Sequence, residues 1–168
     1  QLWLALPEVD EEIEPAFHHY PGADIPVRTI DRVPVRVLMG SAYGATSPVK
    51  TFAETLYVEA HLKAGQRLAL PEAEERALYV VSGALRLGGM TLPEHSMAIL
   101  CRAARVVVEA DTDSRIALIG GEPLGERFID WNFVSSRKER IEQAKSDWRA
   151  RRYPLVPGDE EEFIPLPD

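Results

Sequence analysis

The stretch that decides the fold is GQRLALPEAEERALYVVSGALRLGG, which occupies residues 65–89. Within it, residues 77–82 form an apolar run rich in β-branched and aromatic side chains, and Leu85 and Leu87 then alternate with Ala and Arg. Such side chains favour strands, and a period of two gives a strand one buried face. Gly83 separates the two runs, where a tight turn is expected. The stretch therefore predicts two neighbouring strands of an all-β domain.

The spacing of glycines in this stretch resembles the first sequence motif of the cupin superfamily, in which two histidines and a glutamate bind a metal. Counting along that motif, these ligand positions fall on Pro71, Ala73 and Arg76. The second cupin motif, which carries a third histidine, falls on residues 93–98 and places that position on Ala98. First-row metals bind imidazole and carboxylate donors, and none of these four side chains is such a donor. The resemblance implies a cupin-type double-stranded β-helix, or jelly-roll barrel, without a metal in its usual place.

The composition narrows the class of protein. A length of 168 residues fits one domain, and 45% hydrophobic residues are enough to fill a core. A net charge of −8 argues against a general binder of nucleic-acid backbones, which needs a basic face. No apolar run approaches the ~20 residues that span a bilayer, so no membrane association is expected. The only cysteine, Cys101, excludes an internal disulfide, is expected to be a buried inert thiol, and favours a cytoplasmic location.

Further short strands are predicted on both sides of the central stretch. Residues 25–30 and 33–39 read as a strand pair that turns at Asp31 and Arg32, with the odd-numbered residues of the second strand on one face. Residues 55–62 alternate in the same way. After the central stretch, strands are expected at residues 96–101, 104–110 and 115–119. Short strands at this even spacing are typical of a jelly-roll barrel.

Three segments are read as less regular. Residues 1–6 are expected to form an entering strand that ends at Pro7. Because a domain seldom begins within a strand, the chain is expected to be a fragment or one half of a larger protein. The acidic connector, residues 8–14, reads as a solvated loop. The glycine-interrupted loop at residues 40–47 lacks the Lys-Ser/Thr of a phosphate loop. Its Tyr43 is expected to be exposed, with a place at a pocket mouth as the alternative.

The histidines offer one alternative function. His18 and His19 are adjacent, and adjacent residues of a regular strand point to opposite faces, so this pair cannot chelate one ion there. His61 lies just before the first cupin motif and is expected to be a hydrogen-bonded structural histidine. The alternative is a metalloenzyme whose displaced site uses His18, His19, His61 and His95.

The pattern changes to a helical period after the barrel. The sequence SRKE at residues 136–139 reads as a capping box, and Ile141, Ala144, Lys145 and Trp148 follow at helical spacing as an inward stripe. The basic side chains of this region are Arg137, Lys138, Arg140, Lys145, Arg149, Arg151 and Arg152. They are expected to form a solvated face, and an electrostatic dock for an acidic protein partner is the alternative. We expect a barrel over residues 1–130, and a helix with an extended tail over residues 131–168 that packs on the barrel or on a partner domain.

A more specific resemblance covers nearly the whole chain. It is carried by QLW at residues 1–3, LYVVSG at 78–83, GGEPL at 120–124, WNFVSS at 131–136 and the ending at 157–167. These segments resemble the C-terminal half of pirin-like proteins, and the ending is similar to the bacterial branch. Pirins are two-cupin proteins. The resemblance implies an N-terminal cupin that binds iron through three histidines and one glutamate, all upstream of this sequence, and a C-terminal cupin that has lost its ligands.

From this resemblance we expect a metal-free C-terminal cupin that supports an iron-binding N-terminal cupin, its partner. No catalytic, cofactor-binding or metal-binding residue is expected in this chain, and it is not expected to be an enzyme by itself. The roles associated with the family are a quercetin 2,3-dioxygenase activity and, in animals, iron-dependent transcriptional co-regulation. Direct nucleic-acid binding by this chain is not expected.

Overall fold

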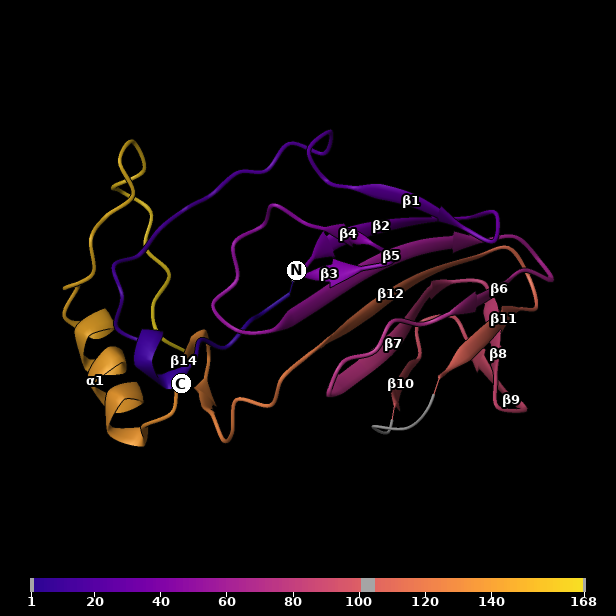
Figure 1. Cartoon of the computed structure of the whole chain (residues 1–168). Helices are drawn as coiled ribbons and strands as arrows, with labels where there is room; N and C mark the ends of the chain where they lie inside the picture. The colour runs from indigo at the N-terminus through magenta and orange to yellow at the C-terminus, as the bar shows by residue number, and fades with distance from the viewer. Residues whose placement is uncertain (1, 101–104, 168) are drawn as a thin grey trace. The chain divides into compact units, whose positions relative to one another are not determined.

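The computed structural model describes residues 2–100 and 105–167, so Cys101 lies outside the described residues (Figure 1). The contacts divide the chain into two compact units. The larger unit is Glu14–Pro123, and the smaller unit combines Gln1–Ile13 with Leu124–Asp168. The sequence predicted a division at residue 130 instead. The difference arises because residues 1–13 make their contacts with the region around the C-terminal helix.

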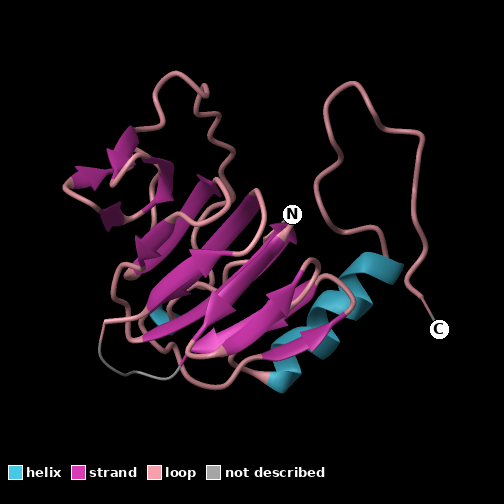
Figure 2. Ribbon diagram, turned by 90° about the vertical axis from the view of Figure 1, so that its right-hand side faces the viewer, coloured by secondary structure: helices cyan, strands magenta, loops and turns pink. Residues whose placement is uncertain are grey.

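The larger unit consists of two antiparallel sheets, whose strands appear as magenta arrows in Figure 2. The six-stranded sheet has the order β1 (Val27–Ile30), β2 (Val33–Met39), β5 (Thr55–Leu62), β12 (Ser114–Gly121), β7 (Glu75–Ser82) and β10 (Met97–Leu100). The four-stranded sheet has the order β6 (Arg67–Ala69), β11 (Val107–Ala110), β8 (Ala84–Leu87) and β9 (Met90–Pro93). A short hairpin, β3 (Ser41–Ala42) and β4 (Ala45–Thr46), stands apart from both sheets. Many strand neighbours are distant in sequence, as the crossover connections of a jelly roll require.

One hydrophobic core joins the two sheets. Val35 and Val58 of the six-stranded sheet and Leu85 and Val108 of the four-stranded sheet belong to the same buried cluster. The predicted alternation is confirmed in β5, and in β2 as far as Val37. It is wrong for Met39, because a register shift after Val37 pairs Met39 with Tyr57 and leaves it only partly buried. The predicted turn between β1 and β2 is confirmed as well, because these strands pair directly up to Ile30 and Val33.

The strand predicted at residues 1–6 is wrong. Residues 2–7 belong to no strand, and Leu2, Trp3 and Leu4 are each about half exposed. A strand forms only where a neighbour accepts and donates its backbone hydrogen bonds, and none of the described strands pairs with this segment. The segment leads instead into a single 3₁₀ turn, η1 (Glu8–Asp10).

The smaller unit contains the helix α1 (Lys138–Arg149) and the hairpin β13 (Phe128–Asp130) and β14 (Phe133–Ser135). Ile141 and Ala144 of the predicted inward stripe are buried, which confirms that part of the prediction. The capping box is wrong, because Arg137 is the residue that precedes the first turn and no side chain caps it. Among the described residues, no helix combines the length and apolar character needed to cross a bilayer.

Candidate functional site

The four positions that the cupin motif assigns to metal ligands lie near one another in the larger unit. Arg76 is on β7, and Ala98 is on the neighbouring strand β10, paired with Leu78. Ala73 lies next to Arg76, because a Cβ built on Gly120 of β12 would come within 3.1 Å of the Ala73 Cβ and 3.0 Å of the Arg76 Cβ. Ala73 and Ala98 both pack against the hydrophobic core. Residues that the motif places apart in sequence are therefore neighbours in the fold.

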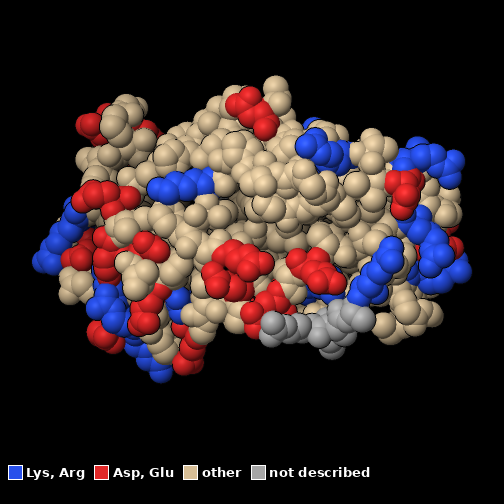
Figure 3. Space-filling view, viewed as in Figure 1, with Lys and Arg blue, Asp and Glu red and all other residues tan. Residues whose placement is uncertain are grey.

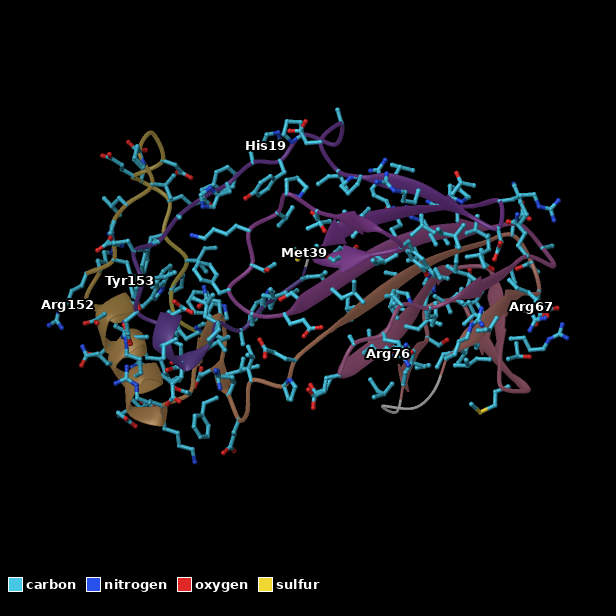
Figure 4. All side chains as sticks on the ribbon, viewed as in Figure 1. His19, Met39, Arg67, Arg76, Arg152 and Tyr153 are labelled. Carbon is cyan, nitrogen blue, oxygen red and sulfur yellow. The ribbon has the colours of Figure 1, made fainter. Side chains whose placement is uncertain are left out.

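Arg76 fills the position of the ligand glutamate. Its side chain is labelled in Figure 4, and the residue is only 4% exposed. One terminal nitrogen, Nη1, donates a hydrogen bond to the carbonyl oxygen of Pro71 at 2.7 Å. A guanidinium group has donors but no acceptor and stays protonated, so it can neither ligate a cation nor tolerate one beside it. The residues at these four positions do not fit a metal ion.

Tyr43 provides a second contact with the same chain segment. It occupies the turn between β3 and β4 with a positive φ of 51°, followed by Gly44 at 70°. The Tyr43 hydroxyl donates to the carbonyl oxygen of Ala69 at 2.7 Å, and its ring packs against the core. Burial raises the pKa of Tyr43 above its ordinary value. The exposed tyrosine expected from sequence is therefore wrong, because the hairpin turns this side chain inward.

The histidines are not gathered into a metal site. His18 and His19 lie in an exposed segment without strand structure, and His95 lies in a turn with a φ of 62°. The His61 side chain is 60% exposed, and its Nε2 lies 3.3 Å from Oε1 of Glu59. Within residues 2–100 and 105–167, no three His, Cys, Asp or Glu side chains lie close enough together to hold a metal ion. The predicted hydrogen bond of His61 is confirmed.

A shallow hollow of about 420 Å³ lies beside His61. Lys63 forms an ion pair with Asp113 at 2.7 Å across its rim. The hydrogen bond from Lys63, together with the backbone N–H of Ala64, lowers the pKa of Asp113. Arg115 similarly contacts Glu59, at the edge of the same hollow. These charges are paired with one another, and Arg32 also lines the hollow.

Comparison with known families identifies the chain. The family model described as the Pirin C-terminal cupin domain matches residues 57–154, which is more than half of the sequence. The chain belongs to the pirin family. The predicted fold class, a cupin-type jelly roll with one C-terminal helix, is thereby confirmed together with the predicted resemblance.

Three relatives show how far the similarity extends. A pirin-like protein of Caulobacter vibrioides is 45% identical over the whole chain, which covers 59% of that relative. A putative quercetin 2,3-dioxygenase of Pseudomonas aeruginosa is 35% identical over 91% of the chain and is covered to 56%. Human pirin is 32% identical over 89% of the chain and is covered to 54%. The chain therefore spans little more than half the length of the pirins that it matches.

Solved structures agree with this assignment. A crystal structure named as quercetin 2,3-dioxygenase from Acinetobacter baumannii superposes with a TM-score of 0.88 at 26% identity. That superposition covers 99% of this chain and 57% of the other chain. A second structure, from Geobacillus kaustophilus, covers 74% of this chain with a TM-score of 0.67. The match to the Acinetobacter structure therefore includes residues of both compact units.

The segment WNFVSS, which is prominent in the pirin resemblance, builds the aromatic centre of the smaller unit. The Trp131 and Trp148 ring centroids are 5.1 Å apart, and those of Phe133 and Tyr153 are 6.2 Å apart. Trp148 also stacks on Phe163 of the tail. Its Nε1 donates to the carbonyl oxygen of Ile164 at 2.8 Å, which fixes the tail beside the helix.

Most of the basic side chains of the helix region are engaged within the smaller unit. Arg137 and Arg140 both contact Glu12, and Lys145 contacts Asp130 at 2.7 Å. Three further side chains have other partners: Arg152 contacts Asp147, Arg151 lies over the Phe163 ring, and Lys138 lies over the Phe128 ring. The ion pairs among these contacts reduce the positive charge that remains available to an acidic partner.

The acidic connector is mostly exposed, as its sequence predicted, but Glu11 is an exception. The Glu11 side chain is 10% exposed, and its carboxylate forms an ion pair with Nε of Arg127 at 3.0 Å. It also accepts hydrogen bonds from the Ser135 hydroxyl and from both the backbone and the hydroxyl of Ser136. Glu11 thereby takes the place of the predicted capping box. Because its partners follow more than 110 residues later, no local pattern could have revealed this role.

Proposed function

We propose that this chain is the metal-free C-terminal cupin of a longer, two-cupin pirin, in which it supports an iron-binding N-terminal cupin. The observation that carries the proposal is Arg76, a buried cation at the ligand glutamate position that donates to the Pro71 carbonyl oxygen. A positively charged donor at this place opposes a metal ion on electrostatic grounds. Pro71, Ala73 and Ala98 supply no imidazole or carboxylate to compensate.

The activity of the longer protein is part of the same proposal. Two of the similar proteins carry the name quercetin 2,3-dioxygenase, which favours an oxygenase that acts on flavonol-type substrates. In that protein the iron would be bound by the N-terminal cupin, and this chain would contribute packing and shape. Transcriptional co-regulation, associated with animal pirins, is a further role of the longer protein rather than of this chain.

The proposal is tested by metal analysis of the purified chain. After incubation with Fe(II) without oxygen and exhaustive dialysis, we expect far less than one equivalent of iron and no turnover of quercetin. A reconstructed variant, with Pro71→His, Ala73→His, Arg76→Glu and Ala98→His, is the matched control and is expected to retain more metal. Stoichiometric iron in the unmodified chain would overturn the proposal.

A further inference from the structure

The face of the six-stranded sheet that points away from the core carries a continuous apolar row. Directly paired residues of an antiparallel sheet project from the same face. Following the pairing across five strands, one row runs through Ile99, Ala77, Ile119, Tyr57 and Met39. None of these side chains is charged. Ile99 is exposed, Ile119, Tyr57 and Met39 are partly buried, and Ala77, the smallest of them, is only 8% exposed. The row is separate from the buried cluster, to which Leu78, Leu118 and Val58 contribute from the opposite face.

The next row of the same face shows where the apolar area ends. Met97, Tyr79 and Ala117 are paired across β10, β7 and β12, and the row then continues into Glu59 and Arg36. In this second row the apolar residues extend from β10 to β12, and charged residues begin at β5. An apolar centre beside a polar rim is the usual anatomy of a protein interface.

The two outermost side chains of this face are strongly exposed. Ile99 is 78% exposed and Met97 is 51% exposed, and both lie on the edge strand β10. The space-filling view shows one side of the protein, on which charged side chains are sparse over the middle (Figure 3). An antiparallel sheet with one face in water normally alternates apolar and polar side chains. In this sheet both faces are apolar on the β10 side, which indicates a partner surface.

We propose that this face, defined by Ile99, Ala77, Ile119, Tyr57, Met97 and Tyr79, is the surface on which the other cupin half of the longer protein docks. The inference rests on the proposed function. The other half is long enough to cover this face. This chain covers 59% of the Caulobacter relative, and the remaining 41% of that protein lies outside the match. The occupant is therefore a polypeptide segment that presents an apolar face of its own and leaves Glu59 at the rim.

The methionines provide an internal test that needs no substitution. Met97 lies on the proposed face, whereas Met90, 63% exposed, lies on β9 of the other sheet, and Met39 is partly buried. Peroxide converts exposed methionine to its sulfoxide, which peptide mass spectrometry locates. In the chain alone, Met97 and Met90 should oxidise at similar rates. In a chimera that joins the unmatched N-terminal part of the Caulobacter relative to this chain, Met97 should oxidise at least fivefold more slowly and Met90 at an unchanged rate.

Substitutions then separate the possible occupants. Ile99→Glu should leave the melting temperature of the chain alone unchanged within a degree or two but lower that of the chimera by several degrees, and Met90→Glu should be neutral in both. Equal oxidation of Met97 in both proteins, or a neutral Ile99→Glu in both, would overturn the proposal. A dimer of the chain alone that Ile99→Glu dissociates would assign the face to a second copy and would also overturn it.

Rapid oxidation of Met39 would reveal a chimera that does not fold. In that case the two halves are co-expressed as separate polypeptides. Capture of the N-terminal part by this chain, lost with Ile99→Glu and kept with Met90→Glu, would support the proposal, and absence of capture would overturn it. The iron content of this chain is measured independently. Either proposal, the docking surface or the metal-free cupin, can therefore be contradicted while the other stands.

Discussion

At the scale of single residues, Glu11 links charge to the stability of the smaller unit. Burial alone would raise the pKa of Glu11, but hydrogen bonds from Ser136 and Ser135 and the charge of Arg127 hold it below the ordinary value. A carboxylate with a lowered pKa stabilises the fold fully above its ordinary pKa of about 4.3, and this contribution is lost as pH falls through the folded-state pKa. We therefore expect Glu11→Gln to lower the free energy of unfolding by about 1–3 kcal/mol near neutral pH.

The same variant should also flatten the acid dependence of stability. Urea unfolding followed by tryptophan fluorescence at a series of pH values below neutrality measures both effects. Glu14→Gln is the matched control, since Glu14 belongs to the same connector but is exposed. An acid dependence that is equally steep in the wild type and in Glu11→Gln would contradict this role.

Arg76 is expected to contribute to stability through its hydrogen bond to the Pro71 carbonyl oxygen. Arg76→Met keeps an unbranched side chain but removes the hydrogen bond to the Pro71 carbonyl oxygen, so we expect a loss of about 1–3 kcal/mol. Arg67→Met is the control, because the Arg67 side chain is 69% exposed and should change stability by less than about 0.5 kcal/mol. Circular dichroism during urea unfolding compares the two, and equal effects would show that Arg76 is not structural.

At the scale of elements, the turn between β7 and β8 depends on glycine for two reasons. Gly83 has a φ of 84°, and a Cβ there would lie 2.4 Å from the Asp113 carbonyl oxygen and 2.4 Å from the Ser114 hydroxyl. Gly89 has a similar φ of 87° but no atom within 4 Å of a built Cβ. Gly89→Ala should therefore lower the free energy of unfolding only by the cost of a left-handed backbone at a residue with a Cβ, about 1 kcal/mol. Gly83→Ala should lower it by about 2–4 kcal/mol. Thermal unfolding of the two variants measures the difference, and equal losses would exclude the steric contribution.

The strands show what a local pattern can predict. The period-two alternation is a property of neighbouring residues, so it identified the buried face of β5 and that of β2 as far as Val37. It missed the register shift that turns Met39 to the other face. The spacing of the cupin motif likewise selected Ala73, Arg76 and Ala98, which are neighbours in the fold. The entering strand and the capping box failed because their outcome depends on distant partners: residues 2–7 find no strand to pair with, and Glu11 reaches Ser136 across the sequence. Tyr43 was missed because the direction of a hairpin turn is set by the strands that it contacts.

At the scale of the whole molecule, the two compact units should be distinguishable by spectroscopy. All three tryptophans, Trp3, Trp131 and Trp148, belong to the smaller unit, whereas most strands belong to the larger one. Among the described residues, the fully packed apolar side chains of the smaller unit are Ile141 and Ala144, while the larger unit holds the main core. Because stability rises with the apolar surface that is buried, the smaller unit should unfold first.

Tryptophan fluorescence should therefore report a lower urea midpoint than far-ultraviolet circular dichroism, which follows the strands. Leu118→Ala, in the core at β12, should lower the circular dichroism midpoint through a loss of about 2–5 kcal/mol and leave the fluorescence midpoint nearly unchanged. Glu11→Gln should have the opposite selectivity, because its contacts lie within the smaller unit. Coincident transitions in all three proteins would show instead that the two units unfold as one cooperative structure.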